Sequence, residues 1–476
     1  MSTVWKSIFK VLLLAAALVS LSLPARAADS LLWSTNKNGV TVDIKDWALP
    51  KLLAKISGAT GWRVILEPGT SATITAKFQN VSADEALNRL LSNINFAKDS
   101  RNGVPHLLVF HTTARAATQV IAPSETGPRD YRIPNELIVR LKRNSTESID
   151  DLAKALGAKV VGRDDRLKLY RLQFADADAA NAAATQLGSD SSVGLIDSNY
   201  VVDRPNPVVN APLVGMAGTP PSLNVNPVAN GVVIGLIDTA VQMQNGFNQY
   251  SLPPLSVVGQ PNEPADQISH GTSMFETLVL NMAADPGKIL PVDVYPVGDS
   301  TTTYEVIEGI TKAINPGAAA LDSSATTQNP GAATPTSANT PGANIINLSL
   351  GGTGDSALLQ SLIEEGTQKG VLFVAASGND GGTAPTYPAA YPGVLAITAS
   401  DPNGQLASYA DDGSFVRAMA PGTSIVYLNG QPWEVQGTST ATAFATASIA
   451  QIINEQHLSV NQAVTQFIQS HRPPRQ

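Results

Sequence analysis

The 476-residue chain contains no cysteine, and this absence removes several kinds of chemistry. Disulfide bonds, thiolate catalysis and cysteine-based metal sites all need that side chain. Histidine is also scarce, and no pair of histidines has the spacing of a zinc motif. We therefore expect no zinc and no resident cofactor. The five histidines are His106, His111, His270, His457 and His471.

Basic residues are few in the second half of the chain. From residue 225 onward, 6 Lys and Arg face 19 Asp and Glu, a balance of −13. Contacts to phosphates need a basic face, so this half is not expected to bind nucleic acid. We interpret the acidic surface as one that keeps the protein in solution.

Long apolar runs are absent except near the N-terminus. Lys6 and Lys10 precede an apolar run at residues 11–23, and Ala25-Arg26-Ala27 follows with the pattern of a cleavage site. This order predicts a signal peptide at residues 1–27, too short for a membrane span. Its three cations leave with it, so the formal charge changes from −8 to −11. We expect an exported bacterial protein, periplasmic or extracellular, with no membrane span.

The length predicts more than one domain, and residues 28–112 form the first candidate. Strand patterns at 40–44, 62–66, 74–78 and 107–110 alternate with helices at 46–57 and 86–91. A capping box at 82–85 precedes the second helix. The stretch from "VDIKDWALPKLL" to "ADEALNRLLSNINF" resembles the secretin and TonB-receptor short N-terminal domain. The resemblance implies a docking module for a bacterial envelope protein through residues 38–110.

A linker at 113–129 leads to a second candidate domain at 130–203. Strands at 135–142, around 160, at 167–174 and at 193–202, with helices between them, give the β-α-β-β-α-β order of a ferredoxin-like fold. Over about 131–203 this unit resembles the inhibitor-type propeptide of subtilisin-like proteases. The Pro-rich stretch at 204–228 is predicted to be an exposed connector that contains the processing bond.

The third candidate domain, 229–470, alternates buried strands with helices. Strands are expected at 232–237, 289–297, 345–350, 371–376 and 394–398, and helices at 271–283, 303–314 and 355–368. Continuous apolar strands separated by helices predict an α/β domain with a doubly wound parallel sheet, covered on both faces. The low-complexity insertion at 315–344 is expected to be a surface loop.

Four polar residues lie where such a sheet places its chemistry, beyond the strand ends or at a helix start. Asp238 ends "GVVIGLID", His270 lies in "SHGTS", Asn379 follows "LFVAASG", and Ser439 begins the small-residue run "STATAFATASIA". Each also has a structural explanation: a turn cap for Asp238, a core histidine, a Gly-Asn turn and a helix N-cap.

Taken together, "GLIDTAV", "SHGTS", "INLSLGG", "VAASGNDG", "APGTSI" and "GTSTATAFA" resemble the subtilisin-like serine proteases over about 230–455. The resemblance implies that Ser439 is the nucleophile, His270 the general base and Asp238 the residue that orients the histidine. It further implies that the Asn379 amide binds the oxyanion. Protein or peptide substrates and inhibition by the chain's own propeptide follow from the same resemblance.

Several positions depart from the family's pattern. Ser273 stands where a second histidine is usual, Ala443 where proline is common and Phe444 where histidine is. The short stretch "NMAADPGK" lacks an Asn-rich calcium loop, so calcium at that site is not expected.

By resemblance, residues 349–351 and residues 376–378 form the two walls of the substrate pocket, and Thr386 lies at its floor. The Thr386 side chain would fill volume there and favour Leu or Met before the scissile bond; the alternative is that it points away and specificity is broad. The substrate-binding residues are Ser349, Leu350, Gly351, Ala376, Ser377, Gly378 and Thr386.

Two other classes of function compete with a protease. The first is a catalytically silent envelope protein that acts through the N-terminal domain, and the intact quartet argues against it. The second is an esterase or lipase, which would need a Gly-x-Ser-x-Gly elbow that this chain lacks. A self-processing serine endopeptidase is the prediction.

Overall fold

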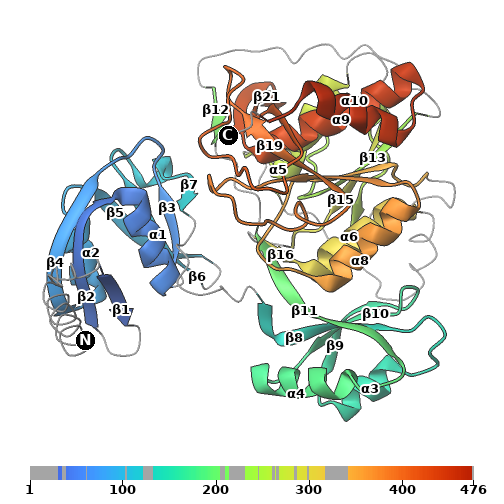
Figure 1. Cartoon of the computed structure of the whole chain (residues 1–476), viewed down its shortest axis with the longest axis horizontal. Helices are drawn as coiled ribbons and strands as arrows, with labels where there is room; N and C mark the ends of the chain where they lie inside the picture. The colour runs from blue at the N-terminus through green and yellow to red at the C-terminus, as the bar shows by residue number, and fades with distance from the viewer. Residues whose placement is uncertain are drawn as a thin grey trace, which may run out of the picture. The chain divides into compact units, whose positions relative to one another are not determined.

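The computed structural model of the protein describes residues 30–34, 39–60, 62–101, 104–121, 132–203, 209–213, 231–244, 246–259, 263, 267–282, 287–296, 300–316 and 341–473. The predicted signal peptide and most of the low-complexity insertion lie outside these residues. The chain divides into two compact units, with the boundary close to residue 126. Figure 1 shows both units, and each is described by itself.

The first unit contains two small sheets, β1-β2-β4 and β5-β6-β3-β7, with helices α1 and α2 packed on a shared apolar core. The predicted capping box is present in part, because the Ser82 side chain accepts a hydrogen bond from the Glu85 backbone N–H. Three strands described in this unit, β1, β5 and β7, lie outside the segments predicted as strands. The elements are β1 Ser30–Ser34, β2 Gly39–Ala48, α1 Leu49–Thr60, β3 Arg63–Leu66, β4 Thr73–Val81, α2 Ala83–Leu90, β5 Asn95–Arg101, β6 Val104–Phe110 and β7 Gln119–Ile121.

The first helix begins later than the sequence predicts. Residues 46–48 belong to β2, and Asp46 has a left-handed backbone with φ of 54°. Its backbone N–H donates to Thr75 Oγ1 of the neighbouring strand, where the pairing register shifts. A polar residue in a strand irregularity therefore resembled a helix cap in the sequence. The predicted linker also contains a strand, β7, because Ile121 is buried in the core.

The second unit begins with the predicted β-α-β-β-α-β order. Its strands form an antiparallel sheet of order β11-β8-β10-β9. The two faces of the sheet bury different residues: Leu137 and Val139 pack under α3 and α4, whereas Ile138 joins the core beside α6 and α8. The elements are β8 Arg132–Leu141, α3 Ile149–Ala155, β9 Lys159–Asp164, β10 Leu169–Gln173, α4 Ala177–Leu187 and β11 Val193–Asp203.

The rest of the second unit is built on a seven-stranded parallel sheet of order β14-β15-β13-β17-β18-β19-β20. Helices α5, α9 and α10 cover one face, and α6 and α8 cover the other (Figure 1). The predicted doubly wound α/β class is confirmed. The elements are β13 Val233–Asp238, β14 Leu255–Ser256, α5 His270–Asn281, β15 Lys288–Asp293, β16 Ser300–Thr302, α6 Thr303–Ile314, β17 Ile345–Leu348, α8 Ala357–Gln368, β18 Leu372–Ala376, β19 Val394–Ser400, β20 Ala418–Pro421, α9 Thr438–Gln456 and α10 Val460–Ser470.

Two expectations about this unit were wrong in detail, and short strands such as β20 were not predicted. Strand β15 ends at Asp293 rather than at residue 297, because the Val294 backbone N–H turns to the Asp238 carbonyl. Part of the predicted connector, β12 (Val209–Pro212), is a strand that pairs with β22 (Gln431–Gln436), which also pairs with β21 (Thr423–Leu428). The remaining connector residues, apart from Leu213, lie outside the described residues.

Candidate active site

Asp238 and His270 are in direct contact at one edge of the parallel sheet. Asp238 is the last residue of β13, and His270 is the first residue of α5; both side chains are buried. His270 Nδ1 lies 2.7 Å and 3.0 Å from the two carboxylate oxygens of Asp238, and the Thr239 backbone N–H also donates to this carboxylate. A carboxylate at Nδ1 favours the tautomer that carries its proton there, which leaves Nε2 as the acceptor.

His270 Nε2 has an open hydrogen-bonding capacity. Among the described residues, only four buried side-chain polar atoms have no hydrogen-bond partner, and Nε2 is one of them. Ser439 does not fill this role in the structure, because its Oγ donates to the Ser349 carbonyl oxygen at 3.2 Å. The structure therefore joins Asp238 to His270 but does not show a hydrogen bond from His270 to Ser439.

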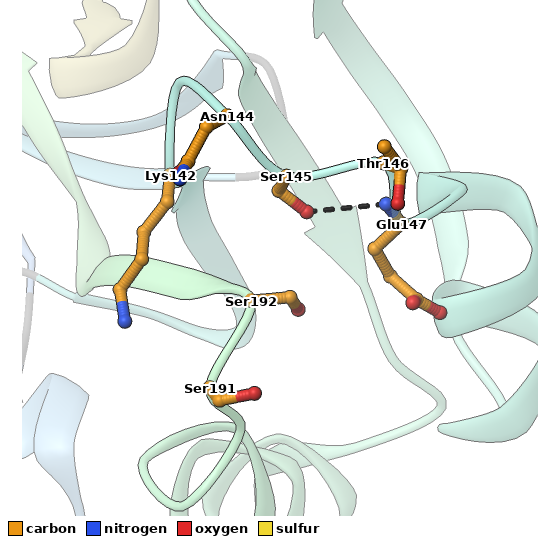
Figure 2. A pocket seen from close by; sticks show the side chains of 7 residues that line it. All are labelled: Lys142, Asn144, Ser145, Thr146, Glu147, Ser191 and Ser192. Atoms are coloured by element: carbon orange, nitrogen blue, oxygen red, sulfur yellow. Dashed lines mark hydrogen bonds between the residues drawn. The ribbon is translucent and has the colours of Figure 1, made fainter.

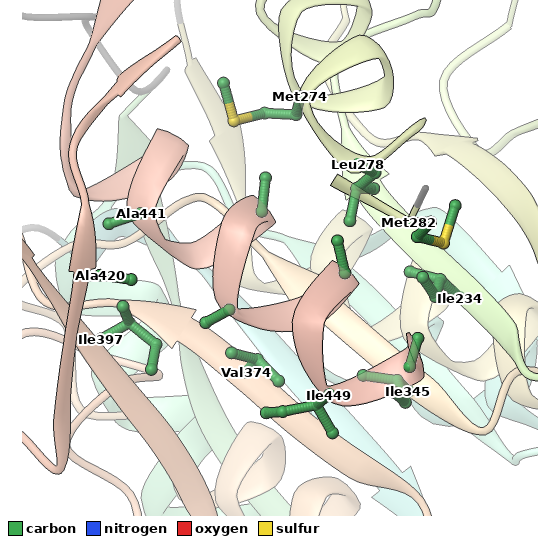
Figure 3. Close-up of a cluster of buried hydrophobic side chains, with 14 of the residues drawn as sticks. Ile234, Met274, Leu278, Met282, Ile345, Val374, Ile397, Ala420, Ala441 and Ile449 are labelled. Atoms are coloured by element: carbon green, nitrogen blue, oxygen red, sulfur yellow. The ribbon is translucent and has the colours of Figure 1, made fainter. Parts of the chain in front are cut away.

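The helix that carries Ser439 packs closely because its residues are small. Figure 3 shows α9 in the core between α5 and the sheet, with Ala441 and Ile449 on its buried surface. Met274 and Leu278 of α5 and Val374 of β18 lie in the same cluster. A larger side chain in place of Ala441 would push the first turns of α9 away from their neighbours, so the small residues there fix the depth at which Ser439 lies.

Asn379 and the first turn of α9 face each other. The Asn379 Oδ1 accepts hydrogen bonds from both the backbone N–H and the Oγ1 of Thr438, each at 2.9 Å. A Cβ atom added to Gly437 would lie 3.3 Å from Asn379 Nδ2 and 3.7 Å from the Ser439 backbone nitrogen. Both nitrogens therefore border the space that the missing side chain leaves, and two convergent N–H groups can bind an oxyanion.

A chain of buried hydrogen bonds ties Ser439 to the sheet. Thr446 Oγ1 donates to Asn347 Oδ1, Asn347 Nδ2 donates to Ser349 Oγ, and Ser349 Oγ donates to the Ser439 carbonyl oxygen. These distances are 2.9, 3.0 and 3.0 Å. The roles of Thr438, Asn347 and Thr446 were not predicted from the sequence. The one available indication was for Thr438, whose hydroxyl directly precedes Ser439 in the chain.

The predicted pocket residues differ in exposure and in their contacts. The side chains of Ser349, Leu350 and Ser377 are buried, so they support the two predicted wall segments rather than line an open surface. Thr386 lies between the walls: its methyl group would be 2.8 Å from a Cβ added to Gly351, and its Oγ1 3.2 Å from a Cβ added to Gly378. Ala376 ends β18 directly before Ser377.

One cavity of the second unit lies apart from these residues. A cavity of about 370 Å³ in the β8–β11 part of the second unit is lined by polar side chains and contains no predicted site residue (Figure 2). Within the residues described, no cluster of three or more His, Asp or Glu side chains is arranged to hold a metal ion. The cavity is lined by Lys142, Asn144, Ser145, Thr146, Glu147, Ser191 and Ser192.

The parallel sheet thus carries a buried Asp–His pair at one edge, and a serine lies in the first turn of α9. Residues 229–471 match the model of the subtilase family, and the chain belongs to that family, whose members include subtilisin-like serine endopeptidases. Residues 117–197 match the fervidolysin N-terminal prodomain.

Among curated relatives, the Minor extracellular protease Epr of Bacillus subtilis is 46% identical over 110 residues, which is 22% of this chain and 17% of Epr. The Thermostable alkaline protease of Halalkalibacterium halodurans is 28% identical over 289 residues, covering 58% of this chain and 70% of that protein. The matched part of this chain spans less than a fifth of the length of Epr. The crystal structure of the epidermin leader peptide processing serine protease of Staphylococcus aureus is 17% identical, covers 70% of this chain and 91% of that one, and has a TM-score of 0.49.

Proposed function

We propose that the protein is a serine endopeptidase that uses Asp238, His270 and Ser439 as its triad. The observation that carries this proposal is the buried Asp238–His270 contact, which leaves Nε2 as an unpartnered acceptor. Buried polar atoms are normally hydrogen-bonded, so an unpartnered acceptor calls for a functional explanation. A serine hydroxyl that attacks a carbonyl supplies the missing donor.

In the proposed reaction, the Ser439 hydroxyl leaves the Ser349 carbonyl by rotation about its Cα–Cβ bond and attacks the scissile carbonyl carbon. His270 Nε2 accepts the hydroxyl proton and then delivers it to the leaving amine nitrogen. Asp238 holds the ring and stabilises the imidazolium ion. The acyl-enzyme is hydrolysed by the same steps, with water in place of the serine hydroxyl.

The negative charge on the carbonyl oxygen would be bound by Asn379 Nδ2 and the Ser439 backbone N–H. Removal of one such donor typically lowers kcat by about 100- to 1,000-fold. The Thr438 side chain and backbone fix the orientation of the Asn379 amide through Oδ1. The position of Ser439 in the first turn of α9 adds the positive end of the helix dipole.

We further propose that residues 130–203 act as an intramolecular inhibitor. Asp197 Oδ2 accepts from Ser356 Oγ and from the Leu358 backbone N–H, at 2.7 and 3.0 Å, and so caps the N-terminus of α8. Asn199 Oδ1 accepts from the Tyr304 backbone N–H in the first turn of α6. Capping two helices in this way gives the prodomain a defined docking position.

The end of the prodomain supports the same role. Val201, Val202 and Asp203 of β11 pair antiparallel with Thr302, Thr301 and Ser300 of β16. The Val201 carbonyl oxygen also lies 3.4 Å from a Cβ added to Gly352, beside the proposed pocket wall. The chain's own backbone thus occupies a strand position that a substrate would take, and self-cleavage in the connector at 204–228 would release it.

For substrates, we propose a preference for Leu or Met before the scissile bond. Thr386 contributes a methyl group between the two walls, which reduces the volume open to an aromatic ring. One methylene more or less in such a pocket is worth about 1–3 kcal/mol, so the preference should be graded.

Export by the signal peptide at 1–27 to the periplasm or the extracellular space is also proposed. Among the residues that the structure describes, no helix combines the length and the apolar character needed to span a bilayer. The first unit would then bind a bacterial envelope protein through residues 38–110. A catalytically silent protein that acts only through this unit is the alternative.

Casein hydrolysis and intact mass of the wild type beside Ser439→Ala separate these functions. We expect the wild type to hydrolyse casein and to yield a fragment that begins between residues 205 and 228. Ser439→Ala should stay full length and inactive. Casein hydrolysis by Ser439→Ala at the wild-type rate would refute the assignment, and identical fragments from both proteins would point to another protease.

A further inference from the structure

The loop that carries Asn379 is held by a second loop, residues 409–412, which precedes β20. Three backbone hydrogen bonds join them: Asp411 N–H to Gly378 O at 3.0 Å, Gly381 N–H to Tyr409 O at 2.8 Å and Asp412 N–H to Gly382 O at 2.9 Å. The position of Asn379 therefore depends on residues 409–412, which lie 30 or more positions further along the chain.

The side chain of Asp411 lies inside this contact. It is 4% exposed, and its Oδ1 accepts hydrogen bonds from the backbone N–H groups of Asp380 and Gly382, at 3.0 and 2.7 Å. Its backbone oxygen accepts from Ser377 Oγ and Thr398 Oγ1, at 2.8 and 2.7 Å. Side chain and backbone together hold the chain on both sides of Asn379.

Burial of the Asp411 carboxylate at this position costs free energy. No Lys, Arg or His of the described residues forms an ion pair with Asp411, although buried charges in proteins are normally paired. Burial raises the pKa of Asp411 to about 6, and the nearby charge of Asp380 acts in the same direction. The backbone N–H groups of Asp380 and Gly382 donate hydrogen bonds to this carboxylate in place of a cation.

Gly378 is the residue that makes room for this carboxylate. Its φ is +119°, and an added Cβ would lie 2.1 Å from Asp411 Oδ2. Any side chain at this position would therefore displace the carboxylate. The Asp411 carboxylate therefore occupies space that is open only because residue 378 is glycine.

We infer that Asp411 is a positioning residue for the oxyanion donor Asn379. The inference rests on the proposed function, and it assigns Asp411 no contact with substrate. The two hydrogen bonds to Oδ1 fix the peptide groups that follow Asn379, and through them the place of its Nδ2 atom. Loss of these bonds lets the donor move away from the developing negative charge, which affects the transition state more than substrate binding.

The test compares Asp411→Ala, Asp411→Asn and the control Asp412→Asn in the full chain, with kcat and KM measured on one peptide substrate. Alanine removes the acceptor, whereas asparagine keeps an oxygen where Oδ1 lies and removes only the charge. We expect kcat to fall by about 10- to 100-fold in Asp411→Ala, with KM changed less than about twofold. Asp411→Asn should recover most of kcat, and Asp412→Asn, whose side chain makes no hydrogen bond among the described residues, should match the wild type.

A double-mutant cycle with Asn379→Ala distinguishes positioning from general destabilisation. If Asp411 acts through Asn379, Asp411→Ala should cost little further activity in the Asn379→Ala protein. Additive losses, or an unchanged kcat in Asp411→Ala, would overturn the inference. Should Asp411→Ala fail to fold, Asp411→Asn still decides: activity as low as that of Asn379→Ala contradicts the role of the oxygen acceptor. An inactive wild type, or full activity in Asn379→Ala, would instead refute the proposed function.

Discussion

Replacing Arg171 with methionine tests how the prodomain is held on the catalytic part of the second unit. Arg171 Nε and Nη2 donate to Glu136 within the prodomain, at 2.7 and 3.0 Å, while Nη1 donates to Glu305 of α6 at 2.7 Å. The side chains of Glu136 and Glu305 are 3% and 13% exposed. Methionine keeps much of the apolar stem but leaves both carboxylates without this cation.

The magnitude follows from the burial. Breaking a fully buried ion pair costs about 3–5 kcal/mol, and exposed pairs contribute about 0–1 kcal/mol. Arg171, which is 21% exposed, lies between these limits, so we expect a loss of about 2–3 kcal/mol. Of the contacts that Arg171 makes with these two carboxylates, the one to Glu305 joins the prodomain to α6. We therefore assign about 1–2 kcal/mol of the loss to docking, or a factor of about 5–30.

Hydrogen exchange in the Ser439→Ala background measures this loss without self-cleavage. We expect the amides of β16, which pair with β11, to lose protection by about 5- to 30-fold in Arg171→Met. Arg163→Met is the matched control, because Arg163 pairs with Asp150 and Asp165 inside the prodomain and is 40% exposed. Equal exchange in the two variants would refute the reasoning.

Three further predictions concern the catalytic domain. Burial raises the pKa of Glu276 to about 7, so the folded state binds this proton more tightly than the unfolded state. The contribution of this proton to stability is present below pH 4.5 and is lost as the pH rises through 7. In the Ser439→Ala background, Glu276→Gln should therefore raise Tm at pH 8 but not at pH 4. An equal gain in Tm at both pH values would contradict the assignment. Gly271→Ala should lower kcat/KM at least about 100-fold, because the new Cβ would lie 2.0 Å from the Thr239 oxygen beside the Asp–His pair; wild-type kinetics would show that the contact relaxes without consequence. Thr386→Gly should shift peptide-library cleavage toward Phe and Tyr, and an unchanged profile would show that Thr386 does not shape the pocket.

The parallel sheet was predictable because its strands are short apolar runs that helices separate. Asp238 could be located because it ends such a run, and Ser439 because small residues follow it without interruption. Strand β20 could not, since Ala418–Pro421 is a short stretch, AMAP, without the β-branched or aromatic residues that favour strands. The late start of α1 was missed because Asp46 looks like a helix cap unless its partner Thr75 is known.

The supporting residues of the site lay beyond the reach of sequence patterns. Asp411 accepts hydrogen bonds from residues 29 and 31 positions away, and Thr446 donates to Asn347 across 99 positions, so nothing in the local sequence of these residues indicates the partner. The quartet itself was found because each member lies at a strand end or a helix start. The hydrogen bond from Ser439 to Ser349 could not be foreseen either, because it depends on one side-chain rotamer.

The most direct test of the central claim is active-site labelling with a fluorophosphonate, followed by peptide mapping. The reagent forms a covalent bond only with an activated serine oxygen and releases fluoride. We predict one adduct per chain, on Ser439, and its loss in His270→Ala while the fold is retained. Labelling of another serine, or labelling of Ser439 that persists at the wild-type rate in His270→Ala, would contradict the account.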